Sequence, residues 1–374
     1  MSDRLKSLFA EFGQSPWLDN LKRSYITSGQ LATTRDSGIR GLTSNPTIFQ
    51  KAIQGSEDYS HQFSQLVNQK LSPIESYWQL VLEDIHSALD VFEPLHQQSQ
   101  GLDGYVSVEV DPALAHDCVG TLKSARELDN KVSRPNVMIK IPATSECIPA
   151  IETMISEGRN VNVTLIFSLE RYQEVMDAYL RGLDRLSKTD ASKIRSVSSV
   201  ASFFISRVDT EIDQRLINGS HSSAEALLGT SAINQAKIAY EMFQKTFSGP
   251  NWNRLEQLGA KVQRPLWAST STKNPKYPDT LYVDSLIGEH TVNTLPDATV
   301  DAFSDHGTLK QTITKDLDRA HEEWKKLGSV GIDVSDVAAK LEREGVASRE
   351  GVASFQKSFD ELISVLAQKA AELS

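Results

Sequence analysis

Cysteine is almost absent from this 374-residue sequence, which contains only Cys118 and Cys147. Neither thiol lies at metal-ligand spacing from a histidine or from the other cysteine, so the sequence indicates neither a disulfide framework nor a zinc site. We therefore expect two reduced packing residues and no bound metal.

Long apolar runs and blocks of positive charge are also missing. No stretch of about 18 apolar residues occurs, which excludes an obvious membrane span, and the first residues are too weakly apolar for a signal peptide. The formal net charge is −10, which argues against sequence-independent binding of nucleic acid. We expect a soluble cytoplasmic protein in which an anionic small substrate would need a local basic pocket.

Glycine-rich phosphate-binding motifs are absent as well, and their absence bears on the fold. Short strand-like segments alternate with helix-like segments, a pattern typical of βα units and a parallel sheet. The expected strands are residues 16–21, 39–45, 105–111, 137–143, 161–167, 197–204, 265–269 and 290–294, and the main expected helices are residues 73–91, 113–128, 147–157, 169–186, 223–247 and 308–327. Eight such units predict a closed (β/α)8 barrel. An open doubly wound sheet is the alternative, but it should carry a G-x-G-x-x-G turn after its first strand.

The domain organisation follows from the length and from the C-terminal pattern. Two average domains would fit 374 residues, but barrels of this size are commonly single, so we expect one barrel domain over residues 1–374. A helical segment over about residues 310–374 would then pack on the barrel exterior or cover its mouth. Its residues 334–374 have the pattern of an amphipathic helix, with one packing face formed by Phe355, Phe359, Leu362, Val365 and Leu366.

A single lysine interrupts the apolar strand of residues 136–142, Asn-Val-Met-Ile-Lys-Ile-Pro. Strand side chains alternate between faces, so Lys140 lies opposite the face of Val137, Ile139 and Ile141. Burial disfavours the charged form of a lysine, and a neutral amine can attack a carbonyl carbon to form a Schiff base. The alternative is an edge-strand lysine whose head lies in solvent.

Polar residues occupy the corresponding face of the neighbouring strands. Three faces of alternating residues are Ser107, Glu109 and Asp111; Asn162, Thr164 and Ile166; and Ser198, Val200, Ser202 and Phe204. Near the catalytic end of a barrel, polar groups of this kind face the interior axis. If the strands follow chain order, Glu109, Lys140 and Thr164 lie on adjacent strands and can converge.

Each of these residues also has a structural explanation when it is considered alone. Glu109 could face solvent on an antiparallel strand, and the hydroxyls of Thr164 and Ser202 fit ordinary strands. Asn45 precedes a proline and could start a turn or a helix, while Asp19 could cap an element. Only convergence in space would distinguish a site from scattered polar residues.

Taken together, the segments resemble the transaldolase family, the class I Schiff-base enzymes of the pentose phosphate pathway, and most closely its longer bacterial branch. The resemblance covers roughly residues 15–300. It is carried by Gly-Leu-Thr-Ser-Asn-Pro-Thr-Ile-Phe (41–49), Val-Ser-Val-Glu-Val-Asp-Pro (106–112), Val-Met-Ile-Lys-Ile-Pro-Ala-Thr (137–144), Asn-Val-Thr-Leu-Ile-Phe-Ser (162–168) and Ser-Phe-Phe-Ile-Ser-Arg-Val-Asp (202–209). It implies a (β/α)8 barrel, no cofactor and a possible homodimer.

The resemblance implies four catalytic roles. Lys140 corresponds to the Schiff-base lysine, and Asp19 to the acid/base that handles the proton of the substrate's C4 hydroxyl. Glu109 and Thr164 correspond to the pair that holds the catalytic water. These types suit the chemistry, because cleavage beside a carbonyl leaves a carbanion that a protonated imine stabilises as an enamine.

The resemblance also implies the substrate-binding residues. Asn45 and Ser202 would bind the hydroxyls of a dihydroxyacetone unit, Phe204 would lie near the catalytic water, and Arg207 would bind phosphate. An ion pair of Arg207 with Asp209 or Asp213 is the alternative for that arginine.

The segment after the seventh strand departs from the family pattern. Many transaldolases have Ala-Ser-Phe-Arg there, with a second phosphate-binding arginine, whereas this chain has Ala268-Ser-Thr-Ser-Thr-Lys-Asn-Pro275. Ser269 matches the serine of the pattern, and Lys273 is the candidate for the missing charge. A compact ammonium does not replace the planar fork of an arginine, so phosphate affinity can differ.

The expected function is transfer of a dihydroxyacetone unit between sugar phosphates. The donor would be sedoheptulose 7-phosphate or fructose 6-phosphate, and the acceptor glyceraldehyde 3-phosphate or erythrose 4-phosphate. One alternative is a fructose-6-phosphate aldolase that releases dihydroxyacetone to water. Phe204 argues against this alternative, because the aldolase would be expected to have a hydrogen-bonding tyrosine at that position. The other is a non-catalytic sugar-phosphate-binding barrel, which would not need Lys140 beside Glu109.

Overall fold

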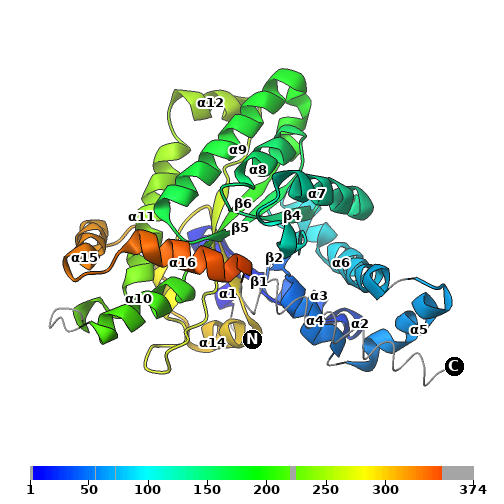
Figure 1. Cartoon of the computed structure of the whole chain (residues 1–374), viewed down its shortest axis with the longest axis horizontal. Helices are drawn as coiled ribbons and strands as arrows, with labels where there is room; N and C mark the ends of the chain where they lie inside the picture. Colours follow the sequence, from blue (N-terminus) through cyan, green and yellow to red (C-terminus); the bar gives the residue numbers. More distant parts are fainter. Residues whose placement is uncertain (1–2, 55, 72, 220–224, 348–374) are drawn as a thin grey trace.

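Eight parallel strands, paired in chain order, close into a barrel (Figure 1). The computed structural model describes residues 3–54, 56–71, 73–219 and 225–347. The strands are β1 (Gln14–Leu18), β2 (Gly41–Thr43), β3 (Tyr105–Glu109), β4 (Val137–Pro142), β5 (Val161–Ile166), β6 (Ser199–Phe204), β7 (Arg264–Ala268) and β8 (Thr291–Leu295). Strands β2 to β6 lie inside strands expected from the sequence, and β1, β7 and β8 extend at most two residues beyond one. The predicted (β/α)8 fold is confirmed.

Helices surround this barrel and connect its strands. They are α1 (Arg4–Phe12), α2 (Arg23–Thr27), α3 (Gln30–Asp36), α4 (Pro46–Gln54), α5 (Ser60–Asn68), α6 (Pro73–Gln98), α7 (Cys118–Val132), α8 (Ile148–Ser156), α9 (Leu169–Thr189), α10 (Ser206–Asn218), α11 (Ser231–Thr246), α12 (Pro250–Gln257), α13 (Leu281–Ser285), α14 (Asp297–His306), α15 (Leu317–Ser329) and α16 (Val334–Ala347). In the described part of the chain, none of them is both long enough and apolar enough to cross a membrane.

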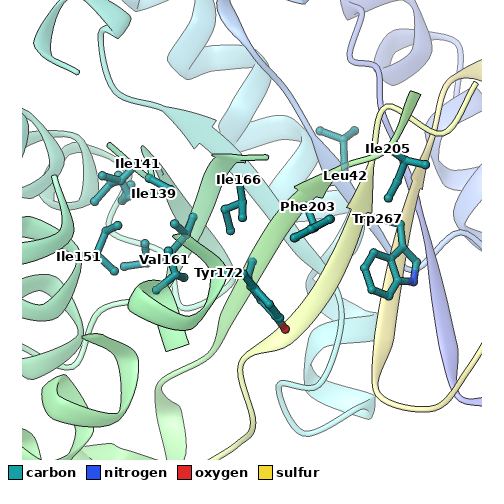
Figure 2. Packing of buried hydrophobic residues seen from close by; sticks show 14 of the residues in the cluster. Leu42, Ile139, Ile141, Ile151, Val161, Ile166, Tyr172, Phe203, Ile205 and Trp267 are labelled. Carbon is teal, nitrogen blue, oxygen red and sulfur yellow. The ribbon is translucent and has the colours of Figure 1, made fainter. Parts of the chain in front are cut away.

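Branched and aromatic side chains fill the layer between strands and helices. Figure 2 shows Ile139 and Ile141 of β4 beside Ile151 of α8, and Phe203 of β6 near Tyr172 of α9. These side chains are fully buried, so strand alternation directs one face of each strand at the helices and the other at the barrel axis. Lys140 therefore has only the interior available to it.

A buried ion-pair network closes the amino-terminal end of the barrel. Asp103, which is fully buried, accepts hydrogen bonds from Arg40 (2.6 Å), Arg264 (3.1 Å), Ser15 (2.9 Å) and Trp17 (3.3 Å). Burial alone would raise the pKa of Asp103, but the two guanidinium groups lower it below its usual value. The network thus joins β1, β7 and the segments before β2 and β3 at this end of the barrel.

A bulge in β5 changes one face that the sequence predicts. Strict alternation places Ile166 on the same face as Asn162 and Thr164. The pairing with β6 instead shifts between Val163 and Ile166, and Leu165 has a φ of 61°. As a result Ile166 packs in the outer core, whereas Leu165 lines the active-site cavity described below. The prediction for Ile166 is wrong, because a bulge reverses the alternation after it.

The C-terminal region differs from the expected helix boundaries. Helix α14, which follows β8, was not among the expected helices, and the helix expected over residues 308–327 begins only at Leu317. The first part of the amphipathic helix predicted over residues 334–374 is α16, from Val334 to Ala347. Its proposed packing residues Phe355, Phe359, Leu362, Val365 and Leu366 lie outside the described residues.

Candidate active site

A cavity of about 630 Å³ opens at the carboxyl ends of the barrel strands. All ten site residues predicted from the sequence line it: Asp19, Asn45, Glu109, Lys140, Thr164, Ser202, Phe204, Arg207, Ser269 and Lys273. They come from seven different strands or the segments that follow them. Convergence of this kind is typical of an active site on a (β/α)8 barrel.

Lys140 and Glu109 form a close pair at the bottom of this cavity. Parallel β3 and β4 place the two residues in register, and the Lys140 Nζ atom lies 3.3 Å from the Glu109 Oε2 atom. Nζ also donates to the Ser44 carbonyl oxygen at 3.4 Å. Only 8% of Lys140 is exposed, so the alternative of a solvent-facing edge lysine is wrong. The carboxylate is positioned to accept the ammonium proton and so generate a neutral nucleophile.

Thr164 lies on the other side of the lysine strand. It is paired across β4 and β5 with Pro142 and is buried. Strands β3, β4 and β5 are therefore consecutive, as the sequence predicted, and Glu109, Lys140 and Thr164 line one cavity. A water molecule bound between a hydroxyl and a carboxylate can transfer protons to and from a reacting carbon.

Asp19 follows β1 and is held by a threonine pair. Its Oδ1 atom accepts a hydrogen bond from Thr43 at 2.8 Å, and the Thr43 hydroxyl lies 2.6 Å from that of Thr294. This contact network joins β1, β2 and β8 around one carboxylate. Both threonines line the cavity and were not singled out from the sequence, although Thr43 stands in one of the motifs quoted above.

Ser202 belongs to a chain of hydrogen bonds across the barrel. It donates to the Asn162 side-chain oxygen at 2.7 Å, and the Asn162 amide donates to the Ser107 hydroxyl at 3.0 Å. Because the Ser202 hydroxyl already donates its only proton to Asn162, its oxygen is left to accept a hydrogen bond from a ligand hydroxyl.

Asn45 combines a structural contact with its place in the cavity. Its side-chain oxygen accepts a hydrogen bond from the Ile48 backbone at 3.0 Å, in the first turn of α4. The alternative of helix initiation therefore holds, but the side-chain amide group keeps two donor hydrogens for a ligand.

Arg207 lies in the first turn of α10, beside Phe204. Its guanidinium carbon is 5.3 Å from the centre of the Phe204 ring, and that ring is 5.0 Å from the ring of Phe167. The structure contradicts the proposed ion pairs, because Asp209 accepts from Tyr282 and the Ala232 backbone, and Asp213 from Tyr277 and the Gly229 backbone. The guanidinium group thus remains available to an anionic ligand.

Ser269 and Lys273 extend the same side of the cavity. Ser269 has a φ of 58°, and its hydroxyl lies 2.8 Å from that of Ser206 at the start of α10. Lys273 is exposed and donates to the Ser271 hydroxyl at 2.9 Å. Ser269 therefore lies near the start of α10, where backbone N–H groups favour an anion, and Lys273 lines the same cavity.

Comparison with known proteins supplies the family. The model of the transaldolase/fructose-6-phosphate aldolase family matches residues 16–366. The chain is 46% identical to a transaldolase of Parafrankia sp. (strain EAN1pec) over 371 residues, which are 99% of this chain and 98% of the relative. It is 45% identical to a transaldolase of Thermobifida fusca (strain YX), with 97% of each chain covered, and 44% identical to one of Mycobacterium tuberculosis (strain CDC 1551 / Oshkosh), with 94% and 93% covered.

The chain belongs to the transaldolase/fructose-6-phosphate aldolase family. The match continues well beyond residue 300, where the resemblance based on motifs ended, and so includes α16.

One cationic residue of this family member was missed in the sequence. Lys51 on α4 is exposed and lines the cavity together with Arg207 and Lys273. The sequence signal was a lysine one turn after the Asn-Pro-Thr motif, on the helix that this motif starts. With Lys140, four cationic side chains line the cavity against the carboxylates of Asp19 and Glu109, so the cavity is locally basic although the net charge of the chain is −10.

Helix α16 contributes the outer wall of the family member's active site. Gly345 and Val346, near its end, line the cavity, and Figure 1 shows the helix crossing the barrel. Ion pairs fix its position on α10: Lys340 lies 2.6 Å from Glu211, and Arg215 lies 2.8 Å from Asp336. In the described part, α16 thus both contacts α10 and reaches the cavity; the role of the whole segment 310–374 stays a prediction.

Proposed function

We propose that this protein transfers a dihydroxyacetone unit from a ketose phosphate to an aldose phosphate through a Schiff base on Lys140. The donor is sedoheptulose 7-phosphate or fructose 6-phosphate, and the acceptor is glyceraldehyde 3-phosphate or erythrose 4-phosphate. The observation that carries the proposal is the Lys140–Glu109 pair, 3.3 Å apart inside a cavity that also contains Arg207. Family membership and relatives named transaldolase support it.

Formation of the Schiff base begins with Glu109. Its carboxylate takes a proton from the Lys140 ammonium, and the neutral amine attacks the C2 carbonyl carbon of the ketose. The resulting carbinolamine loses its hydroxyl as water after proton transfer through a water molecule held by Glu109 and Thr164. A protonated imine remains on the lysine.

Cleavage then depends on Asp19. Its carboxylate accepts the proton of the C4 hydroxyl, the C3–C4 bond breaks, and the electron pair enters the imine to form an enamine. The aldose phosphate product leaves and an acceptor aldehyde enters. The enamine attacks the new carbonyl carbon while Asp19 returns its proton, and hydrolysis of the new imine restores Lys140.

Binding groups hold the two ends of the substrate. Asn45 and Ser202 bind the hydroxyls of the three-carbon unit, which must remain in place until the acceptor arrives. Arg207 binds the phosphate group as a planar fork, with Ser269 and Lys273 beside it. We propose that this reaction takes place in the cytoplasm.

Transfer is favoured over simple aldol cleavage by one residue. The family includes fructose-6-phosphate aldolases, and release of dihydroxyacetone to water would be the reaction of that alternative. Phe204 packs against Phe167 and Arg207 and has no hydroxyl to activate a water molecule, which favours retention of the enamine. A coupled assay distinguishes the two: transfer requires erythrose 4-phosphate, whereas comparable turnover without an acceptor would indicate the aldolase.

Chemical trapping tests the Schiff base itself. Borohydride with fructose 6-phosphate should attach a reduced adduct to Lys140, located by mass spectrometry of peptides. Lys140→Ala should abolish the adduct, and Lys123→Ala, on the exposed surface of α7, should not. Normal trapping in Lys140→Ala would rule out the proposed nucleophile. Substrate binding without any adduct in the parent protein would instead indicate the non-catalytic barrel.

A further inference from the structure

A second cavity, of about 910 Å³, lies at the opposite end of the barrel. It is lined by loops that precede β3 to β7 and by the ends of α6 and α7, and it shares no residue with the active-site cavity. Its volume falls within the range of small-molecule sites. None of the residues used in the proposed reaction lies here.

Lys261 is one of the cations that line this second cavity. It is half-buried, and its Nζ atom donates to the Gly101 carbonyl oxygen at 2.9 Å and to the Ser198 hydroxyl at 3.3 Å. Among the described residues it has no carboxylate at ion-pair distance, and burial together with the charge of Arg264 lowers the pKa of Lys261 to about 8. An ammonium group has three donor hydrogens, so one remains for a ligand.

Arg195 is the second uncompensated cation. It lies in a 3-10 helix (Ala191–Ser196). Arg195 is close to Gly259, in the loop before β7: a Cβ atom built on this glycine would lie 3.2 Å from the Cβ atom of Arg195. Within the part of the chain that the structure describes, it makes no ion pair, and its head is exposed. Gly259 and Lys261 both line the second cavity, so Arg195 stands beside the same loop as the lysine.

The other arginines of the second cavity are already neutralised. Arg134 pairs with Asp90 and Glu93, and Arg159 pairs with Asp129 and Glu157. The cavity thus contains two kinds of cation: arginines that pair with carboxylates, and cations that have no carboxylate partner among the described residues. Lys261 and Arg195 are of the second kind, in a chain whose net charge is −10.

We propose that this second cavity binds a small hydroxylated phosphate monoester, with its phosphate group between Lys261 and Arg195. Two cations facing one space favour an anion, and a phosphate group accepts several hydrogen bonds at once. The hydroxyls of the ligand find partners in the neutral polar side chains that line the same space: Gln97, Gln100, Asn130, Ser133 and Ser196. The lining also contains the carboxyl ends of α6 and α7, whose carbonyl groups accept hydrogen bonds from hydroxyls.

Calorimetric titration with glycerol 3-phosphate tests the proposal. This compound has no carbonyl group and so cannot react with Lys140. The titration uses Arg207→Gln protein, to weaken phosphate binding in the active site. Adding Lys261→Gln should weaken the remaining binding by about tenfold or more, because a charged hydrogen bond in a partly buried site is lost. Adding Arg195→Gln should weaken it less, because its head is exposed.

A matched substitution separates a site from diffuse surface charge. Lys193→Gln removes one positive charge from the same 3-10 helix, but Lys193 does not line the second cavity and pairs with Asp190 at 3.4 Å. It should leave binding unchanged, and an equal loss there would overturn the proposal. The proposal would also be overturned if both Arg195→Gln and folded Lys261→Gln bound the ester as well as the parent does. Arg195 is exposed, so its substitution does not put folding at risk. Inorganic phosphate should bind more weakly than the ester; equal affinity would refute the role of the hydroxyls.

Discussion

At the scale of single residues, the candidate site depends on pairs of side chains that strand pairing brings together. Lys140 and Glu109 stand at facing positions of β4 and β3, and both are largely buried. Removing one partner of such a pair leaves the other charged and desolvated, so both reactivity and stability depend on the pair.

Glu109→Gln should lower kcat by about 10²- to 10⁴-fold, because an amide can neither accept the ammonium proton nor activate the catalytic water. KM should change less, since the shape of the cavity is kept. Steady-state kinetics with fructose 6-phosphate and erythrose 4-phosphate measure both constants. Glu127→Gln on the exposed face of α7 is the control. A kcat equal to that of the control would remove Glu109 from the mechanism.

The two phosphate-binding candidates should differ in importance. Arg207→Ala should raise KM for fructose 6-phosphate by about tenfold or more, because it removes a charged fork beside the cavity. Lys273→Ala should raise it by only a few-fold, about the effect of an exposed charge. Lys276→Ala is the matched control, since Lys276 is exposed in the same loop but does not line the cavity. If Lys273→Ala and Lys276→Ala have the same KM, Lys273 is not a substitute for the family's arginine.

At the scale of elements, buried carboxylates fix the position of α10, the helix that carries Arg207. Asp209 joins this helix to the start of α11, through the Ala232 backbone at 2.7 Å, and to α13, through Tyr282 at 2.9 Å. Asp213 joins it to Tyr277 in the loop that also contains Lys273. The helix that carries Arg207 and the loop that carries Lys273, the two candidate phosphate-binding residues, are thus connected.

Asp209 should make stability depend on pH. Burial, followed by the nearby charge of Asp213, raises the pKa of Asp209 from 3.8 to about 7. The folded state therefore keeps a proton that the unfolded chain loses, so this residue lowers the free energy of unfolding as the pH rises from about 4 to about 7.

Asp209→Asn should abolish this dependence, because an amide fits the same contacts without ionising. Relative to the parent, the variant should gain on the order of 1–3 kcal/mol of stability between pH 4 and pH 8. Urea unfolding at several pH values measures this difference. Asp301→Asn on the exposed face of α14 should show no such trend. A parallel pH profile for Asp209→Asn and the parent would contradict the assignment.

At the scale of the whole molecule, the two ends of the barrel have different roles. The carboxyl ends of the strands bear the candidate active site, while the amino-terminal end contains the buried ion-pair network around Asp103. We propose that the chain folds as one domain, since the strands close on themselves and α16 is fixed to α10 by ion pairs.

Asp103→Ala should destabilise the protein without changing its chemistry. It leaves Arg40 and Arg264 without a carboxylate in the interior, at a cost of about 3–5 kcal/mol. Unfolding should remain one cooperative transition at a lower urea concentration, with kcat and KM of the folded protein unchanged. Asp305→Ala, which is highly exposed, is the control. Two separate transitions, or a large loss of kcat in folded protein, would contradict this division of roles.

Much of the fold and the site could be predicted because strand alternation is local. A period of two residues determines that Lys140, Glu109 and Ser202 point away from the branched face of their strands, whatever the rest of the chain does. The repeated strand–helix pattern then predicted the barrel, and the motifs supplied the roles. The sequence by itself therefore determined the class of fold, the inward face of most strands and ten of the residues that line the cavity.

Contacts between distant segments were decided only by the tertiary structure. The bulge at Leu165 reversed the face of Ile166, and Asp209 and Asp213 bind Tyr282 of α13 and Tyr277 of the loop before it instead of Arg207. The place of Lys51 in the active-site cavity and the existence of the second cavity likewise depend on how separate helices and loops pack together. The physical reason is that hydrogen-bond partners far apart in sequence are chosen by which elements pack together, and local periodicity carries no information about that choice.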